Sequence, residues 1–284
     1  MSILCKRALP LFLLVTVPTA ALAQSLPTSQ PAFMRLIRED VKPGRNAEHA
    51  KVETGWPAAF ERAKSPDYCL GLESMTNNEA WFIIPFASYA AMGEMLARER
   101  GPVLGAEIGR LSRADGDLIN SLRTIELRAR PELSHGAYPD LSKQRYWEIT
   151  VYRMRPGTSE VFSQIAKAYG AALDRSGGKT GYRVYEVMAG MPTPTYFVFS
   201  SVSSFGDFDK LLAEGDATMK AMNPDEAAAG KKFDEGLVSS ETFRFQLSPE
   251  MSYVPSDVRS SDPAFWGPKK PATTPAAPAP KPGQ

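Results

Sequence analysis

Apolar and polar residues alternate along short segments of this chain, and apolar residues recur with helical spacing between those segments. In the first half, period-two alternation predicts four strands, at 33–41, 68–75, 80–86 and 124–130. Helical spacing predicts helices at 46–64 and 88–100, followed by a further helical stretch from 108 to 122. On the first of these helices the apolar stripe contains His49, Val52, Trp56, Phe60 and Ala63.

The second half shows the same order of elements. The alternation predicts strands at 146–154, 182–188, 196–202 and 242–248. Helical spacing predicts helices at 159–175 and 207–213, followed by an Ala-rich helical segment that extends to 238. Two strings of strand, helix, strand, strand, helix and strand therefore follow one another in the chain.

A short motif marks the start of each string. A strand ends in a basic residue and is followed by Pro43–Gly44 in the first half and by Pro156–Gly157, 113 residues later, in the second. Proline lacks a ladder donor and glycine tolerates positive φ, so the pair ends a strand. The segment 124–134 matches 242–252 at the larger offset of 118 residues. Small loop insertions would produce this growth, so the pattern predicts a tandem duplication of a small domain.

Each repeat has the ferredoxin-like order, which predicts an antiparallel sheet with helices on one face. The other face needs a cover, and the second copy provides one. The predicted fold class is therefore α+β, with two tandem ferredoxin-like βαββαβ repeats packed sheet to sheet as a pseudo-dimeric α+β barrel. The predicted repeats cover 33–134 and 145–252, joined by a linker at 135–144.

The ends of the chain lie outside this pattern. Residues 1–23 read as a signal peptide, because Lys6 and Arg7 precede an apolar stretch and a small-x-small cleavage site ends at Ala23. The mature protein is therefore expected to be periplasmic or secreted. After a lead-in at 24–32 and the two repeats, residues 253–284 are expected to form a loop and a disordered Pro/Ala-rich tail. Phe265–Trp266 in that loop is either a plug that docks on the barrel or an exposed aromatic pair.

Composition and charge exclude several classes of partner. Loss of Lys6 and Arg7 leaves 31 basic residues against 32 acidic ones. This balance lacks the excess of positive charge that is typical of proteins that bind nucleic acid or an anionic membrane. No segment after the signal peptide is apolar enough to span a bilayer. Cys69 is the one cysteine left after cleavage, so no internal disulfide is expected.

The duplicated order and the Pro-Gly motif resemble the dimeric α+β barrel superfamily. The opening Tyr152-Arg-Met-Arg-Pro-Gly157 is similar to that of its NIPSNAP-like members, and the resemblance also extends to antibiotic-biosynthesis-monooxygenase-like members. It covers roughly 33–252 and implies a barrel of eight strands within one chain. The superfamily includes heme-degrading monooxygenases, cofactor-free monooxygenases, relatives of chlorite dismutase and members without known activity.

The resemblance does not carry a heme site to this chain. Heme-degrading members use a strand tryptophan followed by a helix histidine. Trp81 could be that tryptophan, but the helix after it contains no histidine. No cofactor is therefore predicted, and heme is retained only as the cofactor of an alternative function. Two distant histidines also predict no metal site.

The two repeats serve as controls for each other when aligned positions differ in polarity. Arg38 aligns with Val151, and His49 aligns with Phe162, so the first repeat places polar groups where the second has apolar ones. Buried polar groups need partners, and a bound ligand is one such partner. The alternative is that both groups lie at open ends of a strand and a helix and reach solvent. The predicted ligand-binding residues are Arg38, His49, Trp56 and Trp81.

Three functions remain open from the sequence. The first is an exported protein that binds a small apolar or acidic ligand in a pocket of the first repeat. The second is a cofactor-free or heme-dependent monooxygenase-like oxidoreductase. The third is a structural module of the cell envelope. Because the second repeat already covers the first, a monomer that acts as a pseudo-dimer is expected.

Overall fold

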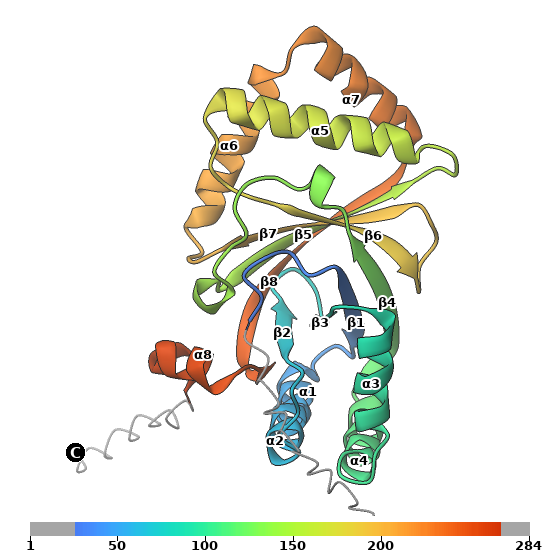
Figure 1. Ribbon diagram of the computed structural model, residues 1–284, viewed down its shortest axis with the longest axis vertical. Helices are drawn as coiled ribbons and strands as arrows, with labels where there is room; N and C mark the ends of the chain where they lie inside the picture. The colour runs from blue at the N-terminus through green and yellow to red at the C-terminus, as the bar shows by residue number, and fades with distance from the viewer. Residues whose placement is uncertain (1–25, 268–284) are drawn as a thin grey trace, which may run out of the picture.

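Eight antiparallel strands close into a barrel in the order β1-β3-β2-β8-β5-β7-β6-β4 (Figure 1). The computed structural model describes residues 26–267. We call 33–134 the N-terminal half and 145–252 the C-terminal half. The strands are β1 (Phe33–Val41), β2 (Cys69–Ser74), β3 (Glu79–Phe86), β4 (Ile119–Ala129), β5 (Tyr146–Met154), β6 (Arg183–Ala189), β7 (Thr195–Val202) and β8 (Leu237–Tyr253). All eight predicted strands are present.

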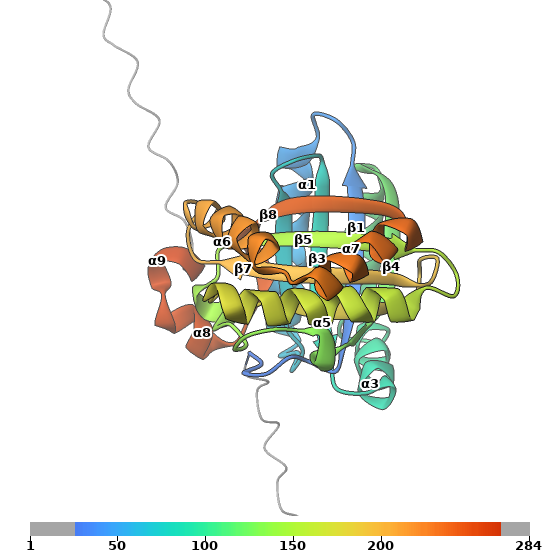
Figure 2. The same ribbon diagram turned by 90° about the horizontal axis from the view of Figure 1, so that it is seen from above.

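Two pairings between the halves close the barrel. β2 pairs with β8, and β4 pairs with β6, so each half has its edge strands covered by the other. Closure removes the unpaired edges that would otherwise be open to aggregation. The ion pairs of Glu186 on β6 with Arg128 and Arg130 also cross one of these seams. Seen from above, the strands of the two halves cross each other (Figure 2).

Side chains fill the barrel interior. On β4, Ile125 and Leu127 point inward and are fully buried, as the predicted alternation requires. Trp81 lies at the centre, with its ring 4.6 Å from the ring of Phe245. The other fully buried members include Leu36, Leu72, Ile149, Phe197 and Leu247. The interior is thus a packed core, and any space for a ligand must lie elsewhere.

The helices cover the outer face of the barrel on two opposite sides (Figure 1). One group belongs to the N-terminal half and the other to the C-terminal half. In the view from above, α5 lies along β5 and β7 (Figure 2). The helices are α1 (Asn46–Glu53), α2 (Gly55–Arg62), α3 (Tyr89–Glu99), α4 (Gly105–Gly116), α5 (Ser159–Ser176), α6 (Asp207–Ala221) and α7 (Pro224–Gly236).

The helix predicted over 46–64 is two helices, and Pro57 explains the break. A proline inside a continuous helix would clash with the carbonyl of the residue four positions earlier, which is Glu53, the last residue of α1. Gly55 then begins α2 in close contact with α4, because a Cβ at Gly55 would lie 2.4 Å from Leu111 Cδ2. The break brings the end of α1 and the body of α4 together.

The helical stretch predicted from 108 to 122 was also wrong in its second part. The helix α4 ends at Gly116, and Ile119 already pairs with Val41 as the first residue of β4. Three apolar positions fitted a helical period, but sheet pairing with β1 determines the structure there. On the C-terminal side, β8 is likewise longer than the predicted 242–248.

The sequence suggested a plain loop after β8, but the structure differs there. The segment forms two short helices, α8 (Ser256–Ser261) and α9 (Pro263–Trp266). Trp266 is buried against the barrel core, and the guanidinium of Arg145 lies over the Phe265 ring, which favours the docking plug over the exposed pair. The predicted signal peptide and most of the predicted tail lie outside the described residues.

The structure therefore confirms an α+β fold with a closed eight-stranded barrel. Between residues 26 and 267, no helix has the length and apolar character needed to cross a bilayer.

Candidate functional site

The four predicted site residues separate into two pairs on opposite faces of the sheet. Arg38 and Trp81 are register partners on β1 and β3, on the barrel-interior face. The Arg38 guanidinium forms two 2.8 Å hydrogen bonds with Glu79 and lies over the Trp81 ring. The Trp81 indole donates to the same carboxylate at 2.6 Å. Glu79 thus already pairs with Arg38, and Trp81 belongs to the core.

His49 and Trp56 lie on the outer face, between the sheet and the helices. The Nε2 atom of His49 lies 2.9 Å from Glu39 Oε2 and 3.3 Å from Asp115 Oδ1. Glu53 lies one turn after His49 on α1 and accepts a 3.1 Å hydrogen bond from the Trp56 indole. We call Glu39, His49, Glu53 and Asp115 the acid cluster; none of its members is more than 5% exposed.

Burial dominates the electrostatics of the acid cluster. It raises the pKa of Asp115 to about 6, with a further contribution from the negative charge of Glu39 and a smaller opposing one from His49. Burial also raises the pKa of Glu53 well above its ordinary value, assisted by Glu39 and Asp115, although the Trp56 hydrogen bond opposes the shift. Asp115 Oδ1 is buried without a hydrogen-bond partner. Among the described residues, no lysine or arginine forms an ion pair with the cluster.

A cavity of about 260 Å³ adjoins the acid cluster. Its walls are largely apolar and aromatic, and the carboxylates of Glu39, Glu53 and Asp115 line it together. The apolar walls come from both the helices and the sheet, and they include Ile37, Trp56, Phe60, Phe82, Ile84 and Ile108. The thiol of Cys69 also lines this space, and burial raises its pKa. We call this space the N-terminal cavity.

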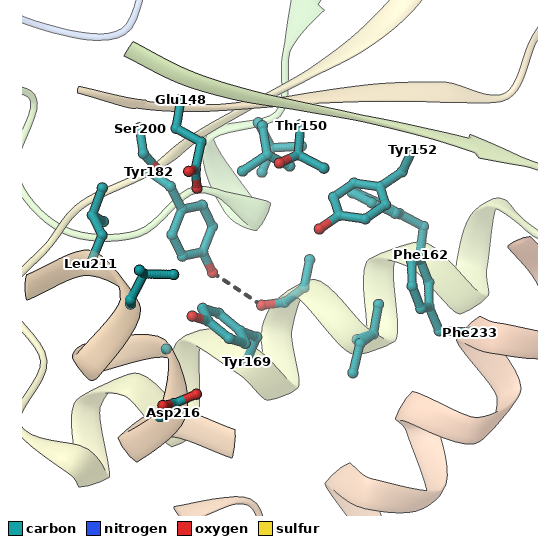
Figure 3. Close-up of a pocket in the computed structure, with 16 residues that line it drawn as sticks. Glu148, Thr150, Tyr152, Phe162, Tyr169, Tyr182, Ser200, Leu211, Asp216 and Phe233 are labelled. Carbon is teal, nitrogen blue, oxygen red and sulfur yellow. Dashed lines mark hydrogen bonds between the residues drawn. The ribbon is translucent and has the colours of Figure 1, made fainter. Parts of the chain in front are cut away.

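The C-terminal half has a larger cavity, of about 390 Å³, between its own helices and sheet. Figure 3 shows Glu148, Thr150 and Ser200 extending from the strands towards Tyr169 and Asp216 on the helices. Glu148 has a partner, because Arg244 donates to it at 2.9 Å. We call this space the C-terminal cavity.

The acid cluster has an apolar counterpart in the C-terminal half. At the offset of 113 residues, Glu39, His49 and Glu53 align with Tyr152, Phe162 and Ala166. At the offset of 118, which aligns the starts of β4 and β8, Asp115 aligns with Phe233. Three of these counterparts pack as aromatic rings, with centroid distances of 5.5 Å for Tyr152–Phe233, 5.9 Å for Tyr152–Phe162 and 6.3 Å for Phe162–Phe233. The same place in the fold is thus charged in one half and aromatic in the other.

Sequence reasoning selected His49 but missed the three carboxylates of the acid cluster. The comparison between repeats that identified His49 would also have identified Glu39, Glu53 and Asp115, because each aligns with an apolar or aromatic residue. His49 and Glu53 also share a helix face at a spacing of four residues. The C-terminal cavity was missed altogether, because its aromatic lining looks like an ordinary core in the sequence.

Heme fits neither cavity through a histidine ligand. The described residues that line the two cavities include no histidine. The imidazole of His49 faces Glu39 and Asp115, and His135 lies 3.4 Å from Asp174. A heme held by proximal histidine, as in globins and peroxidases, therefore has no ligand in these cavities.

No protein family matches this chain by sequence, and no curated protein matches it either. Solved structures do share its fold. An anthrone oxidase-like protein superposes with a TM-score of 0.54 at 11% identity, over 78% of this chain and 93% of its own. A proposed monooxygenase of Lactobacillus acidophilus NCFM gives a TM-score of 0.49 at 9% identity, over 79% and 97% of the two chains. A chlorite dismutase variant of Candidatus Nitrospira defluvii gives 0.47 at 9% identity, over 82% and 96%. The chain shares the fold of the anthrone oxidase-like protein, and its closed eight-stranded barrel is the fold that the resemblance to the dimeric α+β barrel superfamily implies.

Proposed function

We propose that this protein binds a small, mostly apolar ligand in the N-terminal cavity, with the polar end of the ligand directed at the acid cluster. The observation that carries the proposal is the wall formed by Glu39, Glu53 and Asp115 in an otherwise largely apolar space. Ligand sites are mostly apolar with a few convergent polar groups, and this cavity has that composition. Asp115 Oδ1, which is buried and accepts no hydrogen bond, provides an acceptor for a ligand donor.

The lining changes the expected chemistry of the ligand. The sequence suggested a small apolar or acidic ligand with Arg38 among its binding residues, but Arg38 is paired with Glu79 on the other face of the sheet. The N-terminal cavity instead offers the three carboxylates of the acid cluster, and its cation Arg35 pairs with a fourth lining carboxylate, Glu99. A hydroxyl or an ammonium group on the ligand is therefore favoured over an anion.

We also propose that the two halves are tandem ferredoxin-like repeats that form a pseudo-dimer within one chain. The repeated element order and the seam pairings support this proposal. A monomer in solution is expected, because each half already covers the edge strands of the other. Export to the periplasm or the exterior remains part of the proposal and rests on residues 1–23. N-terminal sequencing of the exported chain tests it, with Gln24 as the expected first residue.

Calorimetry with three naphthalene compounds tests the ligand proposal on the purified chain, with a chelator present so that no metal ion contributes to binding. Naphthol and naphthylmethylamine should bind, and naphthoate should not, because they share a ring system and differ in the polar group. Ile108→Trp, which fills the N-terminal cavity, should abolish binding. The matched variant Leu211→Trp fills the C-terminal cavity and should leave binding unchanged. Loss of binding only in Leu211→Trp would assign the ligand to the other cavity and overturn the proposal.

A second candidate is a cofactor-free oxidation of a phenolic or enolisable substrate by dioxygen in the same cavity, with one oxygen atom of the dioxygen entering the product and the other leaving as water. The shared fold with an anthrone oxidase-like protein and the buried carboxylates, which can accept a proton from a hydroxyl group, favour it. Oxygen uptake with anthrone as the probe tests this candidate. Uptake that Asp115→Asn abolishes supports it, whereas uptake no faster than in buffer rules out anthrone oxidation.

A further inference from the structure

We propose that the acid cluster is a binding site for one divalent first-row transition metal ion, with Glu39, His49, Glu53 and Asp115 as ligands. The inference deepens the proposed function of the N-terminal cavity, and it rests on that function only for the nature of the incoming ligand. The four residues come from three elements, β1, α1 and α4, that the fold brings together. Carboxylate oxygens and an imidazole nitrogen are donors that such ions accept.

The charge of the acid cluster requires a cation or retained protons. Three buried carboxylates face a single imidazole, so even a protonated His49 would leave two negative charges uncompensated. No guanidinium or ammonium group of residues 26–267 forms an ion pair with these carboxylates. A divalent ion bound beside a neutral His49 would reduce the charge of the three carboxylates from −3 to −1 without adding a side chain.

The positions of the ligand atoms fit an ion at the centre of the cluster. One donor atom from each residue can be chosen so that all four lie within 4.8 Å of one another. Ligands at about 2.1 Å from a metal on opposite sides lie about 4.2 Å apart, so side-chain shifts of a few tenths of an ångström suffice. Asp115 Oδ1 is an independent sign of such a site, because it is buried and accepts no hydrogen bond. Its ion-pair contact is His49 Nε2 at 3.3 Å, and that nitrogen already lies closer to Glu39 Oε2, at 2.9 Å.

The C-terminal half shows that the fold does not need these charges. Tyr152, Phe162, Ala166 and Phe233 fill the aligned place, and their rings pack with ordinary contacts. Replacing a buried polar cluster with packed apolar groups is often neutral or stabilising. A charged cluster that the barrel does not require is best explained by what it binds.

The metal would also change which ligand the N-terminal cavity accepts. Glu39, Glu53 and Asp115 line the cavity, so an ion among them would lie at its wall. With four protein ligands and a coordination number of five or six, about one or two positions stay open for an oxygen donor. The metal-bound chain should therefore accept an oxygen anion, such as a carboxylate or phenolate, that the metal-free chain rejects.

The test uses the full chain, purified without a polyhistidine tag and made metal-free with a chelator. Mn²⁺ is added and followed by calorimetry and electron paramagnetic resonance, with Zn²⁺ as a competitor. We expect one ion per chain, and at least about tenfold weaker binding in Asp115→Asn and in Glu53→Gln, both of which keep the side-chain shape. Glu99→Gln removes a carboxylate of the same cavity outside the cluster and should bind Mn²⁺ like the parent. Circular dichroism establishes that each variant is folded.

Three outcomes decide the inference. A single ion that depends on Asp115 and Glu53 but not on Glu99 supports it. Absence of Mn²⁺ and Zn²⁺ binding, or binding that all three variants leave intact, overturns it. Naphthoate that binds only with Mn²⁺ present supports the extension to anionic ligands. Naphthol binding by the metal-free chain would stand in either case, so failure of the metal site and failure of the cavity are distinguishable.

Discussion

The two halves of the barrel build the same space with opposite chemistry. Under the helices of the N-terminal half, three carboxylates and an imidazole meet beside a cavity of about 260 Å³. Under those of the C-terminal half, aromatic rings meet beside a cavity of about 390 Å³. The order of strands is the same in both halves, although α1 and α2 stand in one half where the single helix α5 stands in the other. The chemistry beside the two cavities differs because the side chains there differ.

This contrast separates what the fold requires from what a site requires. A helix-to-sheet interface is normally stabilised by apolar burial, and the C-terminal half follows that rule with Phe162, which stacks on Tyr196 at 3.8 Å. The N-terminal half buries His49 at the aligned position and depends on charge pairing there. Stability in one half should therefore respond to volume, and in the other to charge, pH and cations.

The largest expected effect comes from giving the N-terminal half one residue of its counterpart. His49→Phe places the side chain of Phe162 at the aligned position and leaves Glu39 and Asp115 buried without a partner. Breaking a buried ion pair by removal of one member costs about 3–5 kcal/mol. Urea unfolding of the metal-free chain at neutral pH should show that loss as a lower midpoint with an unchanged slope.

Replacing all four residues of the acid cluster with the residues aligned to them in the C-terminal half is the control for this variant. Glu39→Tyr, His49→Phe, Glu53→Ala and Asp115→Phe together remove every charge of the acid cluster and should recover much of the stability that His49→Phe alone loses. The recovery measures the coupling among the four positions. Equal stability of the parent and His49→Phe would mean that the cluster does not depend on His49.

These contacts mark the limit of what the sequence could predict. Alternation located all eight strands, and the repeated Pro-Gly motif located both halves. Period-two patterning predicts which residues share a face of a strand. It does not predict which face packs against helices, or where a cavity remains between the sheet and those helices. Arg38 and Trp81 were placed with His49 for that reason, although they point into the filled interior. The partnership of His49 with Asp115 depends on the packing of α1 against α4, which no local pattern encodes.

A metal ion should stabilise the N-terminal half and have no target in the acid-free C-terminal counterpart. With Mn²⁺ at about one hundred times its dissociation constant, the free energy of unfolding should rise by about 2.7 kcal/mol. Asp115→Asn should reduce the gain, because it removes the charge of the ligand whose Oδ1 accepts no hydrogen bond. Chemical unfolding with and without Mn²⁺ provides the measurement. An equal gain in parent and variant would place the ion elsewhere on the chain.

The metal-free chain should lose stability as pH rises from about 4 to about 6. The pKa of Asp115 is raised from 3.8 to about 6, so the folded state keeps a proton that the unfolded state releases in this window. The stability that this proton contributes is fully present below the pKa of Asp115 in the unfolded state. It is lost as pH rises through the pKa of Asp115 in the folded state. From this group the loss is on the order of 2 kcal/mol. Glu39, His49 and Glu53 face Asp115, and Glu53 acts in the same direction because its pKa is also raised.

Urea unfolding across this pH range checks the sign. Asp115→Asn cannot titrate at that position and should flatten the dependence. A parent chain that gains stability from pH 4 to pH 6 would contradict the protonated form of Asp115 in the folded state.

The smallest change in the free energy of unfolding is expected for Glu148→Gln, which removes a carboxylate from the C-terminal cavity. Glu148 pairs with Arg244 at 2.9 Å, and both side chains are partly exposed to solvent. Partly exposed ion pairs contribute about 0–1 kcal/mol, so Glu148→Gln should destabilise the chain by no more than that. Glu53→Gln removes a buried carboxyl group whose pKa is raised by burial and by Glu39 and Asp115. It should therefore stabilise the metal-free chain at neutral pH, while its amide oxygen can still accept from Trp56. The two substitutions are chemically identical, so opposite signs in paired urea titrations would show that charge is balanced in one cavity and unbalanced in the other. If both variants lose stability, the carboxylate of Glu53 is already compensated, and the reason to place a cation beside it is lost.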